Sequence, residues 1–119
     1  MRPLLCLLLL LSSAAVSAAN ATINFTCCAY TPSTVTIAPG DSVTWNGSFG
    51  PHPLREVDGP SSNTAVPGGF AATSGSTFTH TFNTPGTYHF QCTVHGTGVG
   101  GMRGVVIVQA DNVYANGYE

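Results

Sequence analysis

Charged residues are scarce in this chain. Only 7% of its 119 residues are charged: lysine is absent, arginine occurs three times, and five acidic residues bring the formal net charge to -2. Binding to nucleic acid or to an anionic membrane surface requires clustered basic side chains, and the sequence has no such cluster. These two classes of partner are therefore excluded. The length predicts one domain, which also excludes a multidomain enzyme.

Long hydrophobic runs are also missing, with one exception near the N-terminus. Residues 4–11 form an apolar run that follows Arg2 and precedes small residues ending at Ala18. This order is typical of a secretory signal peptide, whereas a membrane-spanning helix needs about 20 apolar residues. We therefore predict a signal peptide over residues 1–18, one domain over residues 19–119, no transmembrane segment, and export to the periplasm or the cell exterior.

No segment shows a convincing helical period. Apolar and polar residues instead alternate in short segments, separated by turns rich in the 14 glycines and 8 prolines, and this pattern predicts β-strands. Strands are expected at residues 23–29, 34–37, 42–45, 54–57, 78–82, 88–92 and 103–109, with residues 50–75 mostly in loops. The sequence thus predicts an all-β fold, an antiparallel Greek-key β-sandwich of about seven to eight strands.

The cysteines of the predicted domain are odd in number. Cys6 lies in the predicted signal peptide, which leaves Cys27, Cys28 and Cys92 in an oxidising compartment where thiols usually pair. Strand parity places Cys27 in the core and Cys28 on the polar face, so Cys28 is predicted to link two chains in a disulfide-bonded dimer. A bond between these two neighbours would require them to leave the extended conformation. A bond from Cys27 to Cys92 would instead give a stapled sandwich without a metal.

Four residues of metal-ligating types carry the chemistry of the chain. Two residues separate Cys92 from His95 directly after an apolar strand, Met102 follows across a glycine-rich loop, and His52 lies upstream between two prolines. One thiolate, two imidazoles and one thioether form the ligand set of a mononuclear blue-copper site. Soft sulfur favours Cu(I) while imidazole accepts both oxidation states. The predicted ligands of one type 1 copper are therefore His52, Cys92, His95 and Met102.

Two other histidines compete with His52, because local spacing does not fix the upstream ligand. His80 shares a strand face with two phenylalanines, which favours a half-buried histidine of the core. His89 has the opposite parity from Phe90, which favours a solvent-facing or edge position. We therefore predict that neither is a metal ligand.

Nearly all of the predicted domain resembles the cupredoxin family and is close to plastocyanin and halocyanin-type proteins. The resemblance rests on residues 30–45, 50–52, 85–95 and 101–108. It implies a β-sandwich that holds one type 1 copper at the four positions named above and shuttles single electrons. Two features depart from plastocyanin. Pro53 follows the first histidine where asparagine is usual, and the loop between His95 and Met102 is longer.

A copper-binding electron carrier that exchanges electrons with redox protein partners is the predicted function. We expect those partners to contact a small uncharged patch that includes Leu54 and Val99. A copper oxidase or reductase would need further copper centres built from His-x-His pairs, and the four histidines contain no such pair, so the chain is predicted not to be an enzyme. The alternative is an extracellular or periplasmic copper-handling or binding module without a carrier role.

Overall fold

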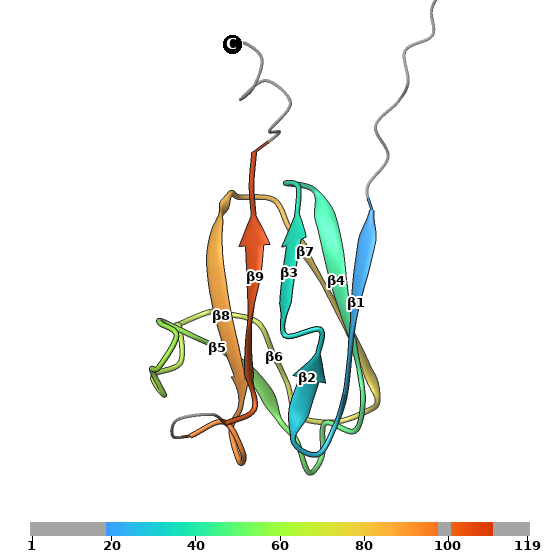
Figure 1. Cartoon of the computed structure of the whole chain (residues 1–119), viewed down its shortest axis with the longest axis vertical. Coiled ribbons are helices and arrows are strands. Elements are labelled where there is room, and N and C mark those ends of the chain that lie inside the picture. Colours follow the sequence, from blue (N-terminus) through green and yellow to red (C-terminus); the bar gives the residue numbers. More distant parts are fainter. Residues whose placement is uncertain (1–18, 98–100, 111–119) are drawn as a thin grey trace, which may run out of the picture.

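The computed structural model describes residues 19–97 and 101–110, which form two packed β-sheets (Figure 1). The strands are β1 (Asn20–Thr26), β2 (Ala29–Thr31), β3 (Thr34–Ile37), β4 (Asp41–Asn46), β5 (Leu54–Val57), β6 (Ala71–Ala72), β7 (Thr77–Phe82), β8 (Gly86–Cys92) and β9 (Arg103–Val108). One sheet has the order β2-β1-β4-β7 and the other β3-β9-β8-β5-β6. The predicted all-β sandwich is confirmed. The predicted signal peptide lies outside the described residues.

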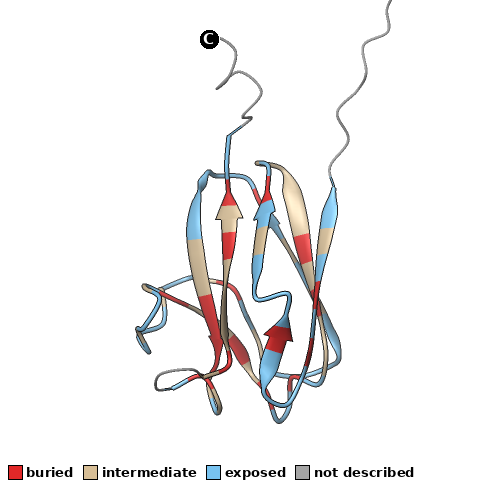
Figure 2. Ribbon diagram, viewed as in Figure 1, coloured by how far each residue is buried: buried red, intermediate tan, exposed pale blue. Residues whose placement is uncertain are grey.

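Helices are absent from the described part of the chain, so it holds none that is long and apolar enough to cross a membrane. The strands form where the sequence alternates, because successive side chains point to opposite faces of a sheet. In β1, Ile23 and Phe25 are buried between exposed neighbours, and in β4 the same holds for Val43 and Trp45 between partly exposed ones (Figure 2). The two inner faces therefore meet in one hydrophobic core.

Both sheets are mixed, whereas the sequence predicted antiparallel pairing throughout. β1 pairs with β4 in parallel, and β3 pairs with β9 in parallel. The chain crosses to the other sheet at β3 before it returns as β4, so β4 enters its sheet in the same direction as β1. Two further strands, β2 and β6, have three and two residues and are too short to leave an alternation pattern in the sequence.

Aromatic rings fill the centre of the core. The fully buried ring of Trp45 lies 5.2 Å from the ring centroid of Phe70, 5.3 Å from that of Phe90 and 5.8 Å from that of Phe78. Tilted and edge-on contacts at these distances stabilise aromatic pairs beyond the area that they bury. Trp45 is therefore a central residue of the core.

The predicted dimer through Cys28 is wrong, because Cys28 is bonded to Cys27 of the same chain. The pairing of Thr26 with Ala29 makes the two cysteines the two-residue turn between β1 and β2, and both are exposed. Strand parity fails here because the strand ends at Thr26, one residue before the pair. The alternative bond from Cys27 to Cys92 is also wrong, since Cys92 is a free, buried cysteine.

Three connections meet at one end of the sandwich. The turn at Cys27 and Cys28, the loop between β4 and β5, and the start of the connection after β8 lie at the end opposite the first residues of β1 and the last residues of β9 (Figure 1). Segments far apart in the sequence are thereby brought together around the end of β8.

Candidate metal centre

Three donor atoms converge at this end of the sandwich. The Sγ atom of Cys92 lies 3.8 Å from Nδ1 of His52 and 3.7 Å from Nδ1 of His95, and the two Nδ1 atoms are 3.1 Å apart. Cys92 is fully buried, His52 is nearly so, and His95 is partly exposed. One thiol and two imidazoles therefore form a compact triangle with one accessible corner.

The loop between β4 and β5 positions His52. Pro51 and Pro53 flank this residue, and each proline ring fixes its own φ near -65° while restricting the residue before it. The backbone N–H of Thr93 donates to the carbonyl of Pro53 at 2.9 Å, which ties this loop to the connection that follows Cys92. The backbone of His52 is thus held by its own sequence and by the neighbouring loop.

Backbone hydrogen bonds close the loop between Cys92 and Met102. The N–H of Gly96 donates to the carbonyl of Cys92 at 2.7 Å, the N–H of Met102 donates to the carbonyl of His95 at 2.9 Å, and the N–H of Cys92 donates to the carbonyl of Met102 at 3.0 Å. Met102 is buried and lies beside Cys92 at the start of β9. These hydrogen bonds hold the backbone of Met102 next to those of Cys92 and His95, while residues 98–100 fall outside the described chain.

Two glycines allow this close approach. A Cβ atom at Gly96 would meet the carbonyl oxygens of Cys92 and Met102, and one at Gly101 would meet the carbonyl oxygen of His95 at 2.7 Å. Neither position has room for a side chain. Packing therefore requires glycine at these two positions of the glycine-rich loop.

Aromatic rings form an apolar wall beside the triangle. The ring of Phe25 lies 6.1 Å from that of His52, and Tyr30 packs against both Phe25 and Phe90. Burial raises the pKa of the Tyr30 phenol well above its ordinary value, and the negative charge of the Cys92 thiolate adds to that rise. The phenol therefore stays protonated, and the wall adds no charge to the site.

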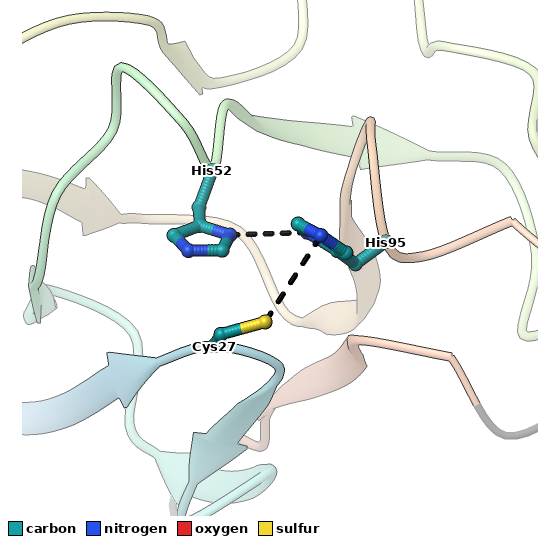
Figure 3. Close-up of side chains that lie close together, drawn as sticks. All are labelled: Cys27, His52 and His95. Atoms are coloured by element: carbon teal, nitrogen blue, oxygen red, sulfur yellow. Dashed lines mark hydrogen bonds between the residues drawn. The ribbon is translucent and has the colours of Figure 1, made fainter.

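A second cysteine also lies near the triangle. Donor atoms of Cys27, His52 and His95 lie within 4.8 Å of one another, and the Sγ atom of Cys27 is 4.0 Å from Nε2 of His95 (Figure 3). The sulfur of Cys27 is already bonded to Cys28, whereas the sulfur of Cys92 is free. Since a metal-ligating cysteine must be a thiolate, Cys92 is the better donor.

Sequence reasoning missed a polar network behind the ligand loop. Gln91 is fully buried although its parity points away from the core, and it accepts a hydrogen bond from Nε of Arg55 and donates one to Asn63. Arg103 donates from Nε to the carbonyl of Gly96 at 2.7 Å and from its guanidinium to Asn63. In the sequence, the network could have been suspected only because Gln91 and Arg103 are direct neighbours of two predicted ligands.

The structure separates the other histidines from the triangle. His80 packs among phenylalanine rings in the sandwich, as expected. His89 is partly exposed and lines a surface cavity of about 200 Å³ together with Arg103. Leu54, expected in a docking patch, is only 1% exposed and pairs with Cys92 across β5 and β8. Val99 lies outside the described residues.

The triangle fits one copper ion. Metal–nitrogen bonds of about 2.0 Å and metal–sulfur bonds of about 2.3 Å, the lengths found at zinc, place the ligand atoms of a trigonal site about 3.5–3.7 Å apart. The observed separations of 3.1, 3.7 and 3.8 Å bracket these values. A thiolate with two imidazoles is also the donor set that copper prefers in trigonal sites with a weak axial thioether.

Solved structures of cupredoxins share this fold. A pseudoazurin from Methylobacterium extorquens AM1 is 23% identical with a TM-score of 0.60, and the match covers 81% of each chain. A purple cupredoxin from Nitrosopumilus maritimus is 23% identical with a TM-score of 0.57, covering 75% of this chain and 99% of the other. A reduced amicyanin variant is 28% identical with a TM-score of 0.55, covering 81% of this chain and 86% of the other.

A family model of copper-binding proteins, the plastocyanin/azurin family, matches residues 17–109. The match spans most of the chain and includes every residue of the triangle. It confirms the resemblance drawn from the sequence. The chain therefore belongs to the plastocyanin/azurin family of copper-binding proteins, and copper is its cofactor.

Proposed function

We propose that this protein is an exported, single-copper electron carrier whose metal ligands are His52, Cys92, His95 and Met102. The observation that carries the proposal is the triangle of donor atoms, in which the free thiol of Cys92 lies within 3.8 Å of both Nδ1 atoms. Cys27 lies near His95, but its disulfide removes it as a thiolate donor. Bound copper supplies a one-electron couple between Cu(I) and Cu(II).

The surrounding residues hold the donor groups in place through contacts within the protein. Prolines on both sides restrict His52, and three backbone hydrogen bonds close the loop that carries His95 and Met102. Arg103, the residue after Met102, donates from Nε to the carbonyl of Gly96 in that loop. A ligand set fixed in this way needs little rearrangement when the charge at its centre changes, which suits rapid electron exchange.

The accessible corner at His95 supports docking of a redox protein. Val94, next to it, is the one large hydrophobic residue among those described that is exposed, at 57%. The whole chain has only eight charged residues, so long-range electrostatic steering is weak. We expect a redox partner to approach through a small apolar contact around Val94, of the size used in transient electron-transfer encounters.

Two observations support export. Disulfides persist in oxidising compartments, and Cys27 is bonded to Cys28. The residues that follow the predicted cleavage position take part in the fold, since the backbone N–H of Ala19 donates to the carboxylate of Asp41 at 2.9 Å and β1 starts at Asn20. We expect the N-terminal sequence of the secreted protein to begin at Ala19.

Copper titration of the purified domain tests the ligand set. The wild type is expected to bind one copper per chain and to show an intense visible absorption from thiolate-to-Cu(II) charge transfer. Cys92→Ser should lose this absorption and retain the β-sheet circular dichroism. The matched control, Cys27→Ser with Cys28→Ser, should keep the colour. If the colour survives in Cys92→Ser, or disappears in the control, Cys92 is not the thiolate ligand of the copper.

Electron exchange tests the carrier role separately from metal binding. Stopped-flow mixing with a one-electron redox protein should reduce the Cu(II) form rapidly, and Val94→Asp should slow the second-order rate without changing the visible absorption. A wild-type protein that binds copper tightly but exchanges electrons no faster than free Cu(II) would favour the copper-handling alternative.

A further inference from the structure

The disulfide between Cys27 and Cys28 is an exposed chemical group at the metal-binding end of the molecule. Both cysteines are exposed, in a two-residue turn whose neighbours Thr26 and Ala29 are exposed as well. Exposed disulfides are open to attack by thiolates, whereas structural disulfides are usually protected. The proposed electron-carrier function makes no use of this bond.

The bond adds little to the stability of the fold. A disulfide stabilises a protein mainly by closing a loop of chain in the unfolded state, and the effect grows with loop length. A bond between neighbours in the sequence closes no such loop. The turn is held without it, because Asn24, Phe25 and Thr26 of β1 pair with three residues of β2. Stability therefore does not explain two adjacent cysteines here.

The imidazole of His95 lies between two sulfur centres. Its Nδ1 atom is 3.7 Å from Sγ of the free Cys92. Its Nε2 atom is 4.0 Å from Sγ of Cys27, and Figure 3 shows His95 beside this cysteine. The first nitrogen faces the predicted copper position, and the second faces the turn. A change in the chemistry at Cys27 therefore changes the surroundings of the His95 imidazole, which is part of the metal-binding triangle.

We propose that Cys27 and Cys28 form a second redox site, a dithiol/disulfide couple that accepts two electrons from a protein dithiol or small thiol. A thiolate of the reductant attacks one sulfur of the pair, so that the bond between Cys27 and Cys28 breaks and a mixed disulfide forms. A second thiol of the reductant then displaces the mixed disulfide. The products are the two cysteine thiols, which take up the two protons of the reductant thiols, and the oxidised reductant as a disulfide.

A thiol reductant is required because the two couples differ in electron number. Copper exchanges one electron per ion, whereas a disulfide accepts two. Since Nδ1 of His95 faces the predicted copper position, Nε2 carries the ring proton and donates, so reduction changes the acceptor that this N–H faces from a disulfide sulfur to a thiol sulfur. The couple therefore acts on the copper site through the surroundings of His95.

Thiol labelling of the native protein tests the reducible bond. Copper-loaded and metal-free samples are incubated in glutathione buffers of increasing reducing strength, alkylated without denaturation, and analysed by peptide mass spectrometry. We expect labelling of Cys27 and Cys28 to rise together from none to two labels per chain, with Cys92 labelled only after denaturation. A bond that stays unlabelled until the protein unfolds would overturn the proposal.

Imidazole nuclear magnetic resonance signals of the Cu(I) form test the link to His95. Reduction of the disulfide between Cys27 and Cys28 should shift the His95 signals. The signals of His80 and His89 should stay in place and serve as internal controls. The double variant Cys27→Ser with Cys28→Ser should show no shift on adding the thiol. Unchanged His95 signals in the fully reduced wild type would refute the link. Because labelling also uses metal-free protein, its failure is distinct from the failure of the proposed copper ligands.

Discussion

Two histidine environments in this molecule differ in what their rings face, and partly buried histidines occur in both. His80, in the sandwich, has the ring centroids of Phe82, Phe70 and Phe78 at 4.7, 5.3 and 6.4 Å. At the metal-binding end, His52 and His95 turn their Nδ1 atoms toward each other at 3.1 Å, with the Cys92 sulfur completing the triangle. Both environments hold histidines that are at least partly buried.

The comparison shows that burial alone does not identify a ligand histidine. Burial among aromatic rings lowers the pKa of His80, because the imidazolium loses its hydration without gaining a partner. His80 therefore behaves as a neutral aromatic ring of the core. A ligand histidine is recognised instead by a ring nitrogen that faces other metal-binding atoms from different parts of the chain.

Removing an aromatic ring from the core should separate stability from metal binding. Phe70 contacts Trp45, His80 and Phe82, and it is buried. We expect Phe70→Ala to lower the free energy of unfolding by about 3–5 kcal/mol, as for other buried phenylalanines, and to leave copper affinity of the folded protein within a few-fold. Denaturant unfolding of the metal-free protein and copper competition titration measure the two effects. A parallel loss of affinity would show that the regions are coupled.

The complementary substitution compares the two histidine environments directly. Even the loss of a residue that only orients a metal ligand lowers affinity by about 10- to 100-fold, so His52→Ala should weaken copper binding by at least about 100-fold. His80→Ala should change it little and should lower stability instead. Competition with a copper chelator measures both variants. Equal loss of affinity in the two variants would contradict the proposed assignment of His52.

The sequence was sufficient to predict the strands in which apolar and polar residues alternate. Val43 and Trp45 are buried because strand parity holds throughout β4, and the final apolar run became β9. The four predicted ligands were identified by residue type, and Cys92, His95 and Met102 also by their spacing within one segment. The structure brings three of the four donor groups together. Their role as ligands remains a prediction that the variants above test.

The features that the sequence did not predict depend on long-range geometry. The turn at Cys27 is set by how β2 folds back on β1, which alternation cannot reveal when the returning strand has three residues. Gln91 is buried despite its outward parity because Arg55 and Asn63 arrive from other parts of the chain to satisfy its amide. Such partners become visible only once the strands are placed in register.

At the metal-binding end, stability and site geometry should change together, unlike in the aromatic core. Gly96→Ala places a methyl group against the carbonyl oxygens of Cys92 and Met102, and against Cβ of Gln91 at 2.8 Å. We expect a loss of about 1–3 kcal/mol in the free energy of unfolding, as for other overpacked sites, together with weaker copper binding. Gly50→Ala is the matched control, since its added methyl would meet nothing within 4 Å. If Gly96→Ala changed neither the free energy of unfolding nor copper binding, the loop would not be closed as described.

The smallest expected effect comes from the charge state of His80. Its pKa in the folded protein lies below the ordinary value of 6.5 because burial disfavours the imidazolium. Between the lowered pKa and 6.5, the unfolded chain binds more protons than the folded one, so the free energy of unfolding rises with pH in that window. The contribution of His80 to the free energy of unfolding is complete above pH 6.5, and it is lost as the pH falls through the lowered pKa.

Substitution of His80 by glutamine isolates this contribution. The wild type and His80→Gln differ in one titrating group, so the other histidines cancel when the two stability curves are subtracted. Denaturant unfolding of both metal-free proteins between pH 5 and 8 should give a difference that grows in favour of the variant as the pH falls. The change is modest because the ring of His80 is only partly buried. A difference that is flat across this range would mean that the phenylalanine rings do not desolvate His80, and the contrast between the two histidine environments would then rest on geometry alone.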